Sequence, residues 1–461
     1  MPGAVNVNQS TFDVELSDPP LDTCGGRGAI PNSTPGYQAT TPALAAGVWQ
    51  LPPSVGVILN HSPASSGRYI GSPSLALQPN GDYVASHDFF GPKANHTINA
   101  TTVVFVSEDK GATWQQVANL EPSFWGKLFM HGEALYLLGT SHEYGNVVIR
   151  RSEDGGRTWT GPCMLRQGRY HCAPCPTLIH NGRIWRSMEE FGGGEWGNFA
   201  ARVMSAPVNA DLLSAASWTL SRALPKQDTF CWLEGNVVLD PGGRIVNVLR
   251  TNDAGADRAA LVRVSEDGQS LSFDPEADLV DMPGGGSKFT IRYDRQTARY
   301  WSIVNKQTEP TAYRNNLVLA SSADLRHWRV EASLLYDPDP CKHAWQYVDW
   351  QFEGADIVFV SRTALDDGLG GARSAHDANY FTFHRIIDAV LESGVKSGED
   401  PTFHTTTTDT TESSISGVLP ARTGSHPGST ETVLIRAPGQ LAAGAGAERR
   451  GKHTNRWLSD H

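Results

Sequence analysis

Short apolar runs recur along the chain and are separated by turn-forming residues. In the first complete unit, an apolar run at residues 74–77 is followed by Asn-Gly at 80–81, by a second run at 83–85 and by a third at 103–106. Asn-Gly and Gly-Gly between two apolar runs are strong hairpin signals. Units of the same kind begin near residues 127, 177, 236, 288 and 347. The pattern predicts an all-β fold built from repeated hairpin units.

A second repeat follows the third run of the first two units. The motif Ser-x-Asp-x-Gly-x-Thr-Trp, an Asp-box, occupies residues 107–114 and again 152–159, and reduced copies begin at Ser265 and Ser322. The Asp can bond the backbone of a tight hairpin, the Gly takes the positive φ there, and the Trp packs beneath it. A hairpin motif at blade-like spacing is typical of a radial repeat. We therefore expect a β-propeller with four-stranded blades.

The number of units sets the expected size of the ring. Six blades are the first choice and seven the alternative. We expect the apolar run at 55–59 to join the last blade and close the ring, because closure removes an open sheet edge. An irregular N-terminal segment is expected over residues 1–50, the propeller over 51–392 and a tail over 393–461. The tail is rich in Thr, Gly, Ala, Ser and Pro, which predicts disorder.

Charge and hydropathy narrow the range of partners. The chain has 461 residues and a formal net charge of −11, which argues against nucleic acid as a partner because little would neutralise phosphates. An anionic substrate is still compatible, since it needs only a local cluster of arginines. No run of 18 apolar residues occurs, so neither a transmembrane helix nor a membrane partner is expected. We expect a monomer.

The location of the protein is predicted from weaker signals. The first residues lack the basic-then-apolar pattern of a signal peptide. Five Asn-x-Ser/Thr sequons nevertheless favour secretion, and we expect an extracellular protein whose leader is not visible in this sequence. The sequons lie at Asn8, Asn32, Asn60, Asn95 and Asn99.

Cysteines and glycine-rich loops give little indication of a cofactor. Six cysteines permit disulfides without requiring them, and Cys172 and Cys175 have CxxC spacing without a second such pair, so no zinc or redox site is predicted. No glycine-rich phosphate loop follows a strand and opens a helix, so no nucleotide cofactor is expected. A structural Ca²⁺ is compatible with the sequence, and no residue is assigned to it.

Polar side chains gather at strand ends, where the active sites of propellers form. His87 ends the second run of the first unit, and His142 holds the same place in the second unit. A histidine there can act as general acid or base because it titrates near neutrality. The structural alternative for His87 is a hydrogen bond to a neighbouring blade. Candidates for substrate binding at similar positions are Arg169, His171, His142, Glu234, Asn236, Arg250, Arg314 and Tyr347.

Arginines and carboxylates allow two further interpretations. An arginine can hold a substrate carboxylate bidentately, although an ion pair between blades is the structural alternative. The candidates are Arg68, Arg169, Arg250 and Arg314, with Arg169 leading because it stands beside Tyr170 and His171. A glycosidase acid pair could come from Glu189, Glu190, Glu234 and Asp349, whose separations the sequence does not define.

Asp-boxes on a propeller resemble those of sialidases. Those enzymes carry an Arg-Ile-Pro stretch before the first blade, whereas residues 68–73 here read Arg-Tyr-Ile-Gly-Ser-Pro. The sequence motifs do not place the Tyr/Glu nucleophile pair or the complete arginine triad of that family.

A closer resemblance covers roughly residues 55–388. It rests on the stretches at 68–74, 85–92 (Ala-Ser-His-Asp-Phe-Phe-Gly-Pro), 168–171, 232–236, 288–294 and 376–380. Together these stretches resemble the propeller enzymes that act on rhamnose-α-1,4-glucuronate caps of arabinogalactan and gum arabic, namely the lyases of polysaccharide lyase family 42 and the rhamnosidases of glycoside hydrolase family 145.

The resemblance implies a lyase with a polysaccharide or oligosaccharide substrate that carries a uronate. It also implies a catalytic histidine early in the propeller, and His87 is the best match. In β-elimination an arginine neutralises the uronate carboxylate, while a histidine removes the C5 proton and returns a proton to the leaving rhamnose oxygen. A rhamnosidase or sialidase-like hydrolase is the alternative, and a glycan-binding propeller without catalysis is the non-enzymatic one.

Overall fold

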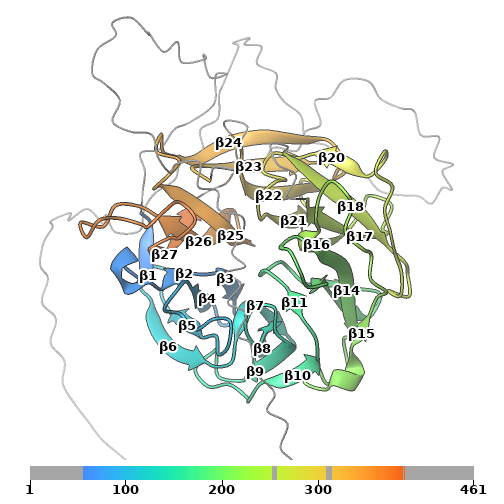
Figure 1. The fold of residues 1–461 in the computed structure, drawn as a ribbon, viewed down its shortest axis with the longest axis horizontal. Coiled ribbons are helices and arrows are strands. Elements are labelled where there is room, and N and C mark those ends of the chain that lie inside the picture. The colour runs from blue at the N-terminus through green and yellow to red at the C-terminus, as the bar shows by residue number, and fades with distance from the viewer. Residues whose placement is uncertain (1–54, 252–256, 308–313, 388, 390–461) are drawn as a thin grey trace, which may run out of the picture.

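The computed structural model describes residues 55–251, 257–307, 314–387 and 389, and these residues form an all-β fold. Six sheets stand around a central axis, each with four strands on its main path (Figure 1). The prediction of a propeller with six four-stranded blades is confirmed. The segment 1–50 and the tail 393–461 lie outside the described residues, so the proposed domain boundaries stay predictions.

The first three blades run from the innermost strand outward in chain order. Blade 1 contains β3 (Ser74–Leu77), β4 (Tyr83–Phe90), β5 (Thr102–Ser107) and β6 (Gln115–Leu120), with β2 (Tyr69–Ile70) also paired to β4. Blade 2 contains β7 (Phe124–His131), β8 (Ala134–Thr140), β9 (Val147–Ser152) and β10 (Cys163–Arg166). Blade 3 contains β11 (Tyr170–His171) and β12 (Leu178–His180), which both pair with β13 (Arg183–Phe191), then β14 (Phe199–Pro207) and β15 (Thr219–Leu220).

The remaining blades complete the ring. Blade 4 contains β16 (Leu233–Leu239), β17 (Ile245–Arg250), β18 (Arg258–Val264), β19 (Leu271–Ser272) and β20 (Leu279–Asp281). Blade 5 contains β21 (Thr290–Asp294), β22 (Arg299–Asn305), β23 (Asn316–Ser322) and β24 (Trp328–Tyr336). Blade 6 contains β25 (Ala344–Glu353), β26 (Asp356–Ala364), β27 (Tyr380–Ile386) and β1 (Val57–His61). Two short 3₁₀ helices, η1 (Ala64–Ser66) and η2 (Ala215–Ser217), lie in connections, and no helix of the described residues could cross a membrane.

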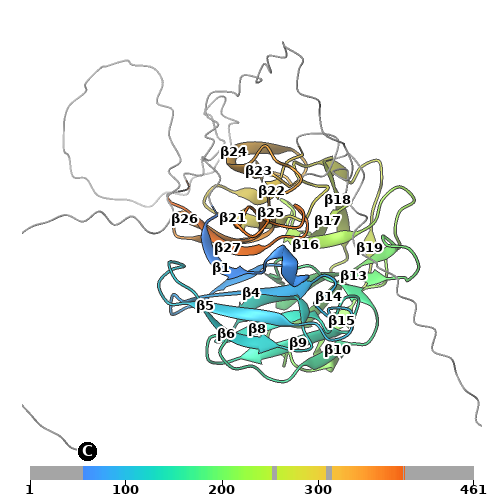
Figure 2. The same cartoon turned by 60° about the vertical axis from the view of Figure 1, so that its left-hand side comes forward.

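The N-terminal strand closes the ring. β1 pairs antiparallel with β27, Val57 opposite Phe383 and His61 opposite Tyr380, so the first strand is the outer strand of the last blade. Figures 1 and 2 show β1 lying beside β27 and next to the first blade. The closure expected for residues 55–59 is confirmed.

The Asp-box hairpins have the geometry that their sequence predicts. Asp109 accepts hydrogen bonds from the backbone N–H and the hydroxyl of Thr113, and Trp114 Nε1 donates to the carbonyl oxygen of Gly111 at 3.2 Å. Gly111 has φ +89°, and a Cβ atom there would lie 2.2 Å from the ring of Phe383. Glycine is therefore required both by the turn and by the packing of blade 1 against blade 6.

Buried side chains fill the space between neighbouring blades. Trp185, Trp232, Trp345 and Trp350 are fully buried. The indole N–H of Trp350 in blade 6 donates to the carbonyl oxygen of Thr290 in blade 5 at 2.8 Å, which satisfies the polar atom of a large apolar ring.

A buried ion network lies on the inner strands. Asp349 of β25 forms an ion pair with Lys127 of β7 and accepts a hydrogen bond of 2.8 Å from the N–H of Leu75, and Arg292 Nη2 lies 3.6 Å from its second oxygen. Burial alone would raise the pKa of Asp349, but the charges of Lys127 and Arg292 lower it. Asp349, a candidate acid from sequence, thus joins blades 1, 2, 5 and 6.

Candidate active site at the bulge end of the propeller

The two ends of the propeller carry different loops. In blade 4, Leu233 at the start of β16 pairs with Arg250 at the end of β17, and Arg250 pairs with Ala259 near the start of β18. Inner strands therefore begin at the end where second strands finish. The Asp-box hairpins join third strands to fourth strands and lie at the opposite end.

Three inner strands share an unusual feature where they begin. β7, β16 and β25, in blades 2, 4 and 6, each contain a β-bulge in their first residues. The bulges hold Trp125, Glu234 and Tyr347, which have positive φ values of 52°, 55° and 55°. A bulky residue in this conformation costs on the order of 1–3 kcal/mol, and such residues gather at functional sites. We call this end of the propeller the bulge end.

Glu234 is paired with an arginine at the bulge end. Its Oε2 atom lies 3.1 Å from Nη1 of Arg250, and each side chain is only 3% exposed. Nε of Arg250 also donates to the carbonyl oxygen of Gly286 at 3.0 Å, which fixes the guanidinium between blades 4 and 5. The pair joins a carboxylate on a strained backbone to a rigidly held cation.

Tyr347 lies between two further guanidinium groups. Cζ of Arg314 is 4.9 Å from the centroid of its ring, and Cζ of Arg362 is 4.7 Å from it. Arg314 donates to the side-chain oxygen of Gln346, while Nε of Arg362 donates to the carbonyl oxygen of His376 at 3.0 Å. Both cations are buried. Two positive charges thus flank one phenol ring.

Lys288 contacts the bulge that holds Tyr347. Its Nζ donates to the carbonyl oxygen of Val348 at 2.7 Å and to that of Tyr347 at 3.5 Å. Burial lowers the pKa of Lys288, and the nearby negative charge of Glu234 is among the groups that raise it. The ammonium group of Lys288 in blade 5 therefore contacts the backbone of the bulge that holds Tyr347 in blade 6.

His171 and Glu189 form a second carboxylate-bearing pair. Nδ1 of His171 is 2.8 Å from Oε2 of Glu189, and Oε1 of Glu189 accepts a hydrogen bond of 3.3 Å from the N–H of Gly235. Glu189 is 1% exposed and His171 is 10% exposed at the side chain. The carboxylate thus orients the imidazole and contacts the bulge that carries Glu234.

The structure places His87 apart from this cluster. Its ring is fully buried between blades 1 and 6, with centroids 5.8 Å from Phe105 and 5.0 Å from Phe381. Nε2 bonds Asn60 at 2.9 Å, and Nδ1 bonds the backbone oxygen of Asp88 at 2.8 Å. Burial lowers the pKa of His87 to about 4. The acid/base role of His87 stays a prediction, and these surroundings favour the structural alternative.

Three other candidates lie outside the cluster. Arg169 is exposed, with Cζ 4.3 Å from the ring centroid of Phe191. His142 bonds the hydroxyl of Ser141 at 2.9 Å in the loop after β8. Asn236 accepts a hydrogen bond of 2.9 Å from the N–H of Ile291 and so joins blades 4 and 5. The structure therefore pairs Glu234 with Arg250 and places Arg314 beside Tyr347. His171 lies close to the Glu234 bulge through Glu189.

Sequence reasoning missed Arg362, Trp125 and the positioning role of Lys288. The end of the second run in unit six would have pointed to Arg362, as it pointed to Arg250 in unit four. No sequence signal marks a left-handed Trp, because the bulge depends on strand pairing between distant residues.

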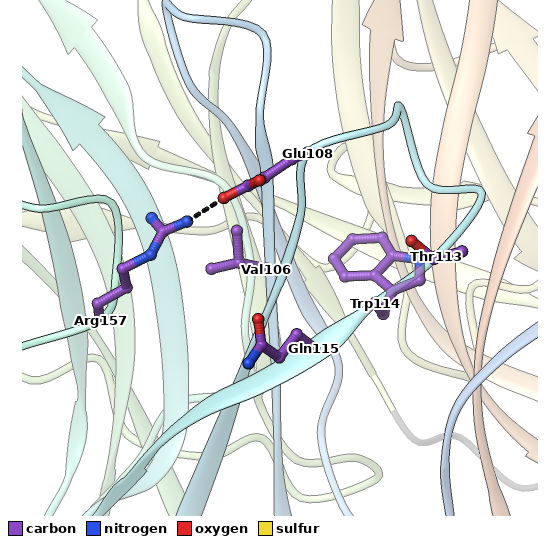
Figure 3. A pocket seen from close by; sticks show the side chains of 6 residues that line it. All are labelled: Val106, Glu108, Thr113, Trp114, Gln115 and Arg157. Carbon is purple, nitrogen blue, oxygen red and sulfur yellow. Dashed lines mark hydrogen bonds and ion pairs between the residues drawn. The ribbon is translucent and has the colours of Figure 1, made fainter.

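The Asp-box end of the propeller has a small surface pocket. Between the first two Asp-boxes, a small pocket is lined by Thr113, Trp114, Gln115 and Val106, and the Glu108–Arg157 ion pair borders it (Figure 3). The hydroxyl of Thr113 is bonded to Asp109, and Arg157 and Glu108 are bonded to each other across the two hairpins. Among the described residues, no group of three or more His, Cys, Asp or Glu side chains could hold a metal ion.

Comparison with known proteins gives similarity of fold only. No protein-family model and no curated protein matches the chain. The α-L-arabinanase of Penicillium chrysogenum complexed with arabinobiose is 15% identical with a TM-score of 0.45, and the match covers 73% of this chain and 98% of that one. The α-L-arabinofuranosidase Arb93A of Fusarium graminearum is 11% identical with a TM-score of 0.43, covering 72% and 98%. The sialidase of Trypanosoma rangeli in complex with sialic acid is 14% identical with a TM-score of 0.48, covering 70% and 54%.

Proposed function

We propose that the protein is a carbohydrate-active enzyme that cleaves a terminal linkage in a glycan whose sugar carries a carboxylate. The observation that carries this proposal is the arginine cluster around Tyr347 and Glu234 at the bulge end. In a chain of net charge −11, buried guanidinium groups from blades 4, 5 and 6 make a local basic site. Guanidinium groups recognise carboxylates through paired hydrogen bonds.

Hydrolysis is the reaction that this arrangement supports best. Tyrosine acts as the nucleophile in sialidases, so a phenol is a competent nucleophile in this chemistry. Tyr347 Oη attacks the anomeric carbon while Glu234 takes the phenolic proton. The bond from that carbon to the leaving oxygen breaks, and His171, oriented by Glu189, gives this oxygen a proton. Water then attacks the anomeric carbon and gives its proton to His171, the bond from that carbon to Tyr347 Oη breaks, and Glu234 returns the proton to the phenolic oxygen.

β-Elimination from rhamnosyl-α-1,4-glucuronate is the second candidate, and the His171–Glu189 pair is the observation in its favour. Here His171 takes the C5 proton of the glucuronate, the bond from C4 to the rhamnosyl oxygen breaks, and His171 returns the proton to this oxygen. An arginine neutralises the carboxylate and so makes C5 more acidic. In this version His171 replaces His87, whose ring is buried.

The two reactions differ in their products. Purified protein is incubated with gum arabic, with aryl glucuronides and with aryl sialosides. Hydrolysis releases a saturated sugar, whereas elimination produces an unsaturated uronate that absorbs in the ultraviolet. Glycan binding without any product would reject the enzyme hypothesis and support a glycan-binding propeller without catalysis.

Variants test the assigned residues. Tyr347→Phe and Glu234→Gln should each lower kcat by about 10³-fold, because nucleophile and base act as a unit. Tyr293→Phe is the matched control, since this tyrosine is 49% exposed. Turnover of Tyr347→Phe at the wild-type rate would exclude Tyr347 as the nucleophile.

We also propose that the protein is extracellular and monomeric. Cys341 is disulfide-bonded, and disulfides persist in oxidising compartments. Secretion from a eukaryotic host, with N-glycans mapped by mass spectrometry and mass measured by light scattering, tests both points.

A further inference from the structure

We infer that Trp125 forms an apolar wall of the sugar site, an inference that rests on the proposed function. Trp125 occupies in blade 2 the bulge position that Glu234 occupies in blade 4 and Tyr347 in blade 6. All three are non-glycine residues with φ between 52° and 55°. The same local distortion thus presents three different side chains at one end of the axis.

A buried carboxylate holds Trp125 in this conformation. Oδ2 of Asp88 accepts a hydrogen bond of 2.6 Å from the N–H of Trp125, and Oδ1 accepts one of 2.7 Å from the N–H of Ser72. A Cβ atom at Gly71 would lie 1.6 Å from Oδ1 of Asp88, so only glycine fits there. Gly71 and Asp88 therefore act together to keep the bulge in place.

The same contacts assign Asp88 a positioning role. Burial raises the pKa of Asp88 to about 6, while its hydrogen bonds to Ser72 and Trp125 lower it. Each carboxylate oxygen of Asp88 accepts a hydrogen bond from a backbone N–H. We therefore assign Asp88 to holding the backbone in place and not to proton transfer to a sugar.

The surroundings of Trp125 fit contact with a sugar. Its ring lies 4.3 Å from the ring of His171 and 5.5 Å from that of Tyr144, measured between centroids. The residue as a whole is 9% exposed. Aromatic rings stack on the C–H faces of pyranoses, and a carboxylate-bearing ring held by arginines presents such a face.

Binding to a catalytically impaired protein tests the inference. The Glu234→Gln variant is titrated with D-glucuronate, N-acetylneuraminate and neutral galactose while tryptophan emission is recorded. We expect the acidic sugars to change the emission and the Trp125→Phe substitution to remove most of that change. Trp125→Gly, in which glycine accepts φ +52° without strain, should weaken binding at least 10-fold, and circular dichroism checks that the fold survives the loss of the buried ring. Trp159→Phe, at the Asp-box end, is the control and should leave binding unchanged.

The outcomes separate this inference from the proposed function. If the protein binds the acidic sugars with equal affinity and an equal change in emission with and without Trp125, Trp125 does not form a wall of the sugar site. A wild-type enzyme that turns over a glycan while no probe alters its emission would overturn the inference as well. If binding depends on Trp125 but no glycan is turned over, the role of Trp125 in sugar binding is supported and the proposed enzymatic activity is rejected. Absence of both turnover and binding would reject both.

Discussion

The ammonium group of Lys288 in blade 5 donates a hydrogen bond of 2.7 Å to the carbonyl oxygen of Val348 in blade 6, directly after Tyr347. A buried cation of one blade thereby holds the left-handed bulge of the next.

Replacing Lys288 should move Tyr347. Lys288→Met removes the ammonium donor from the carbonyl oxygens of Tyr347 and Val348, of which Val348 keeps the hydroxyl of Thr290, and should destabilise the fold by about 1–3 kcal/mol. We also expect kcat to fall at least 10-fold, since a misplaced nucleophile reacts slowly. Urea unfolding and steady-state kinetics measure the two effects. Lys110→Met, which removes an ammonium group that is 57% exposed, is the control. Wild-type kcat in Lys288→Met would show that the bulge holds its shape without this amine.

Breaking the buried Lys127–Asp349 pair should be costly. Asp349→Asn leaves Lys127, 3% exposed at the side chain, without its counter-charge and should cost about 3–5 kcal/mol in unfolding free energy. The double variant Lys127→Met/Asp349→Leu should recover much of this loss because neither buried charge remains. Glu153→Gln, in an exposed pair with Arg151, should change stability by less than about 1 kcal/mol. A double variant as unstable as Asp349→Asn would mean that hydrogen bonds to Asp349, and not its charge, stabilise the axis.

His87 should make the fold sensitive to acid. Burial lowers its pKa from 6.5 to about 4, so between these pH values the unfolded chain binds a proton that the folded protein does not. Stability should therefore fall as the pH drops from 6.5 to 4, by about 3 kcal/mol from this group. His87→Phe should remove this share of the slope in unfolding experiments across that range. The variant also tests the sequence-based role: a loss of kcat of at least about a hundredfold with unchanged stability would support His87 as the acid/base residue.

Arg250 and Arg169 should differ in their effect on a carboxylate substrate. Arg250 is buried beside Glu234, whereas Arg169 is exposed on the loop before β11. Losing a bidentate contact to a carboxylate should cost roughly 2–4 kcal/mol in transition-state binding, and Arg250→Lys should share this loss because lysine lacks the fork. Arg169→Ala should leave kcat/KM within a few-fold.

A carboxyl-reduced analogue of the substrate is the control for the arginine experiment. Arg250→Ala should affect turnover of this analogue much less than turnover of the acid. If Arg169→Ala strongly lowers kcat/KM for the acidic substrate and not for the reduced analogue, Arg169 binds the carboxylate, as the sequence predicted.

Local sequence determined the architecture of this protein. The alternation of apolar runs with Asn-Gly turns, and the Asp-boxes with their glycine at positive φ, act over a few residues, so the hairpins, the six blades and the closing strand at residues 55–59 were predictable. The strand ends predicted from sequence carry Glu234, Arg250 and Tyr347, and the inner and second strands do meet at one end of blades 4 and 6.

Tertiary structure decided which of the polar candidates lie beside other charged groups and which are enclosed by apolar rings. His87 and Tyr347 both looked like strand-end candidates, yet one ring is sealed between Phe105 and Phe381 while the other lies between two guanidinium groups. The bulges of Trp125, Glu234 and Tyr347 depend on register between paired strands and on contacts from the next blade, such as Asp88 to Trp125. Such contacts join residues far apart in the chain, and no local pattern encodes them.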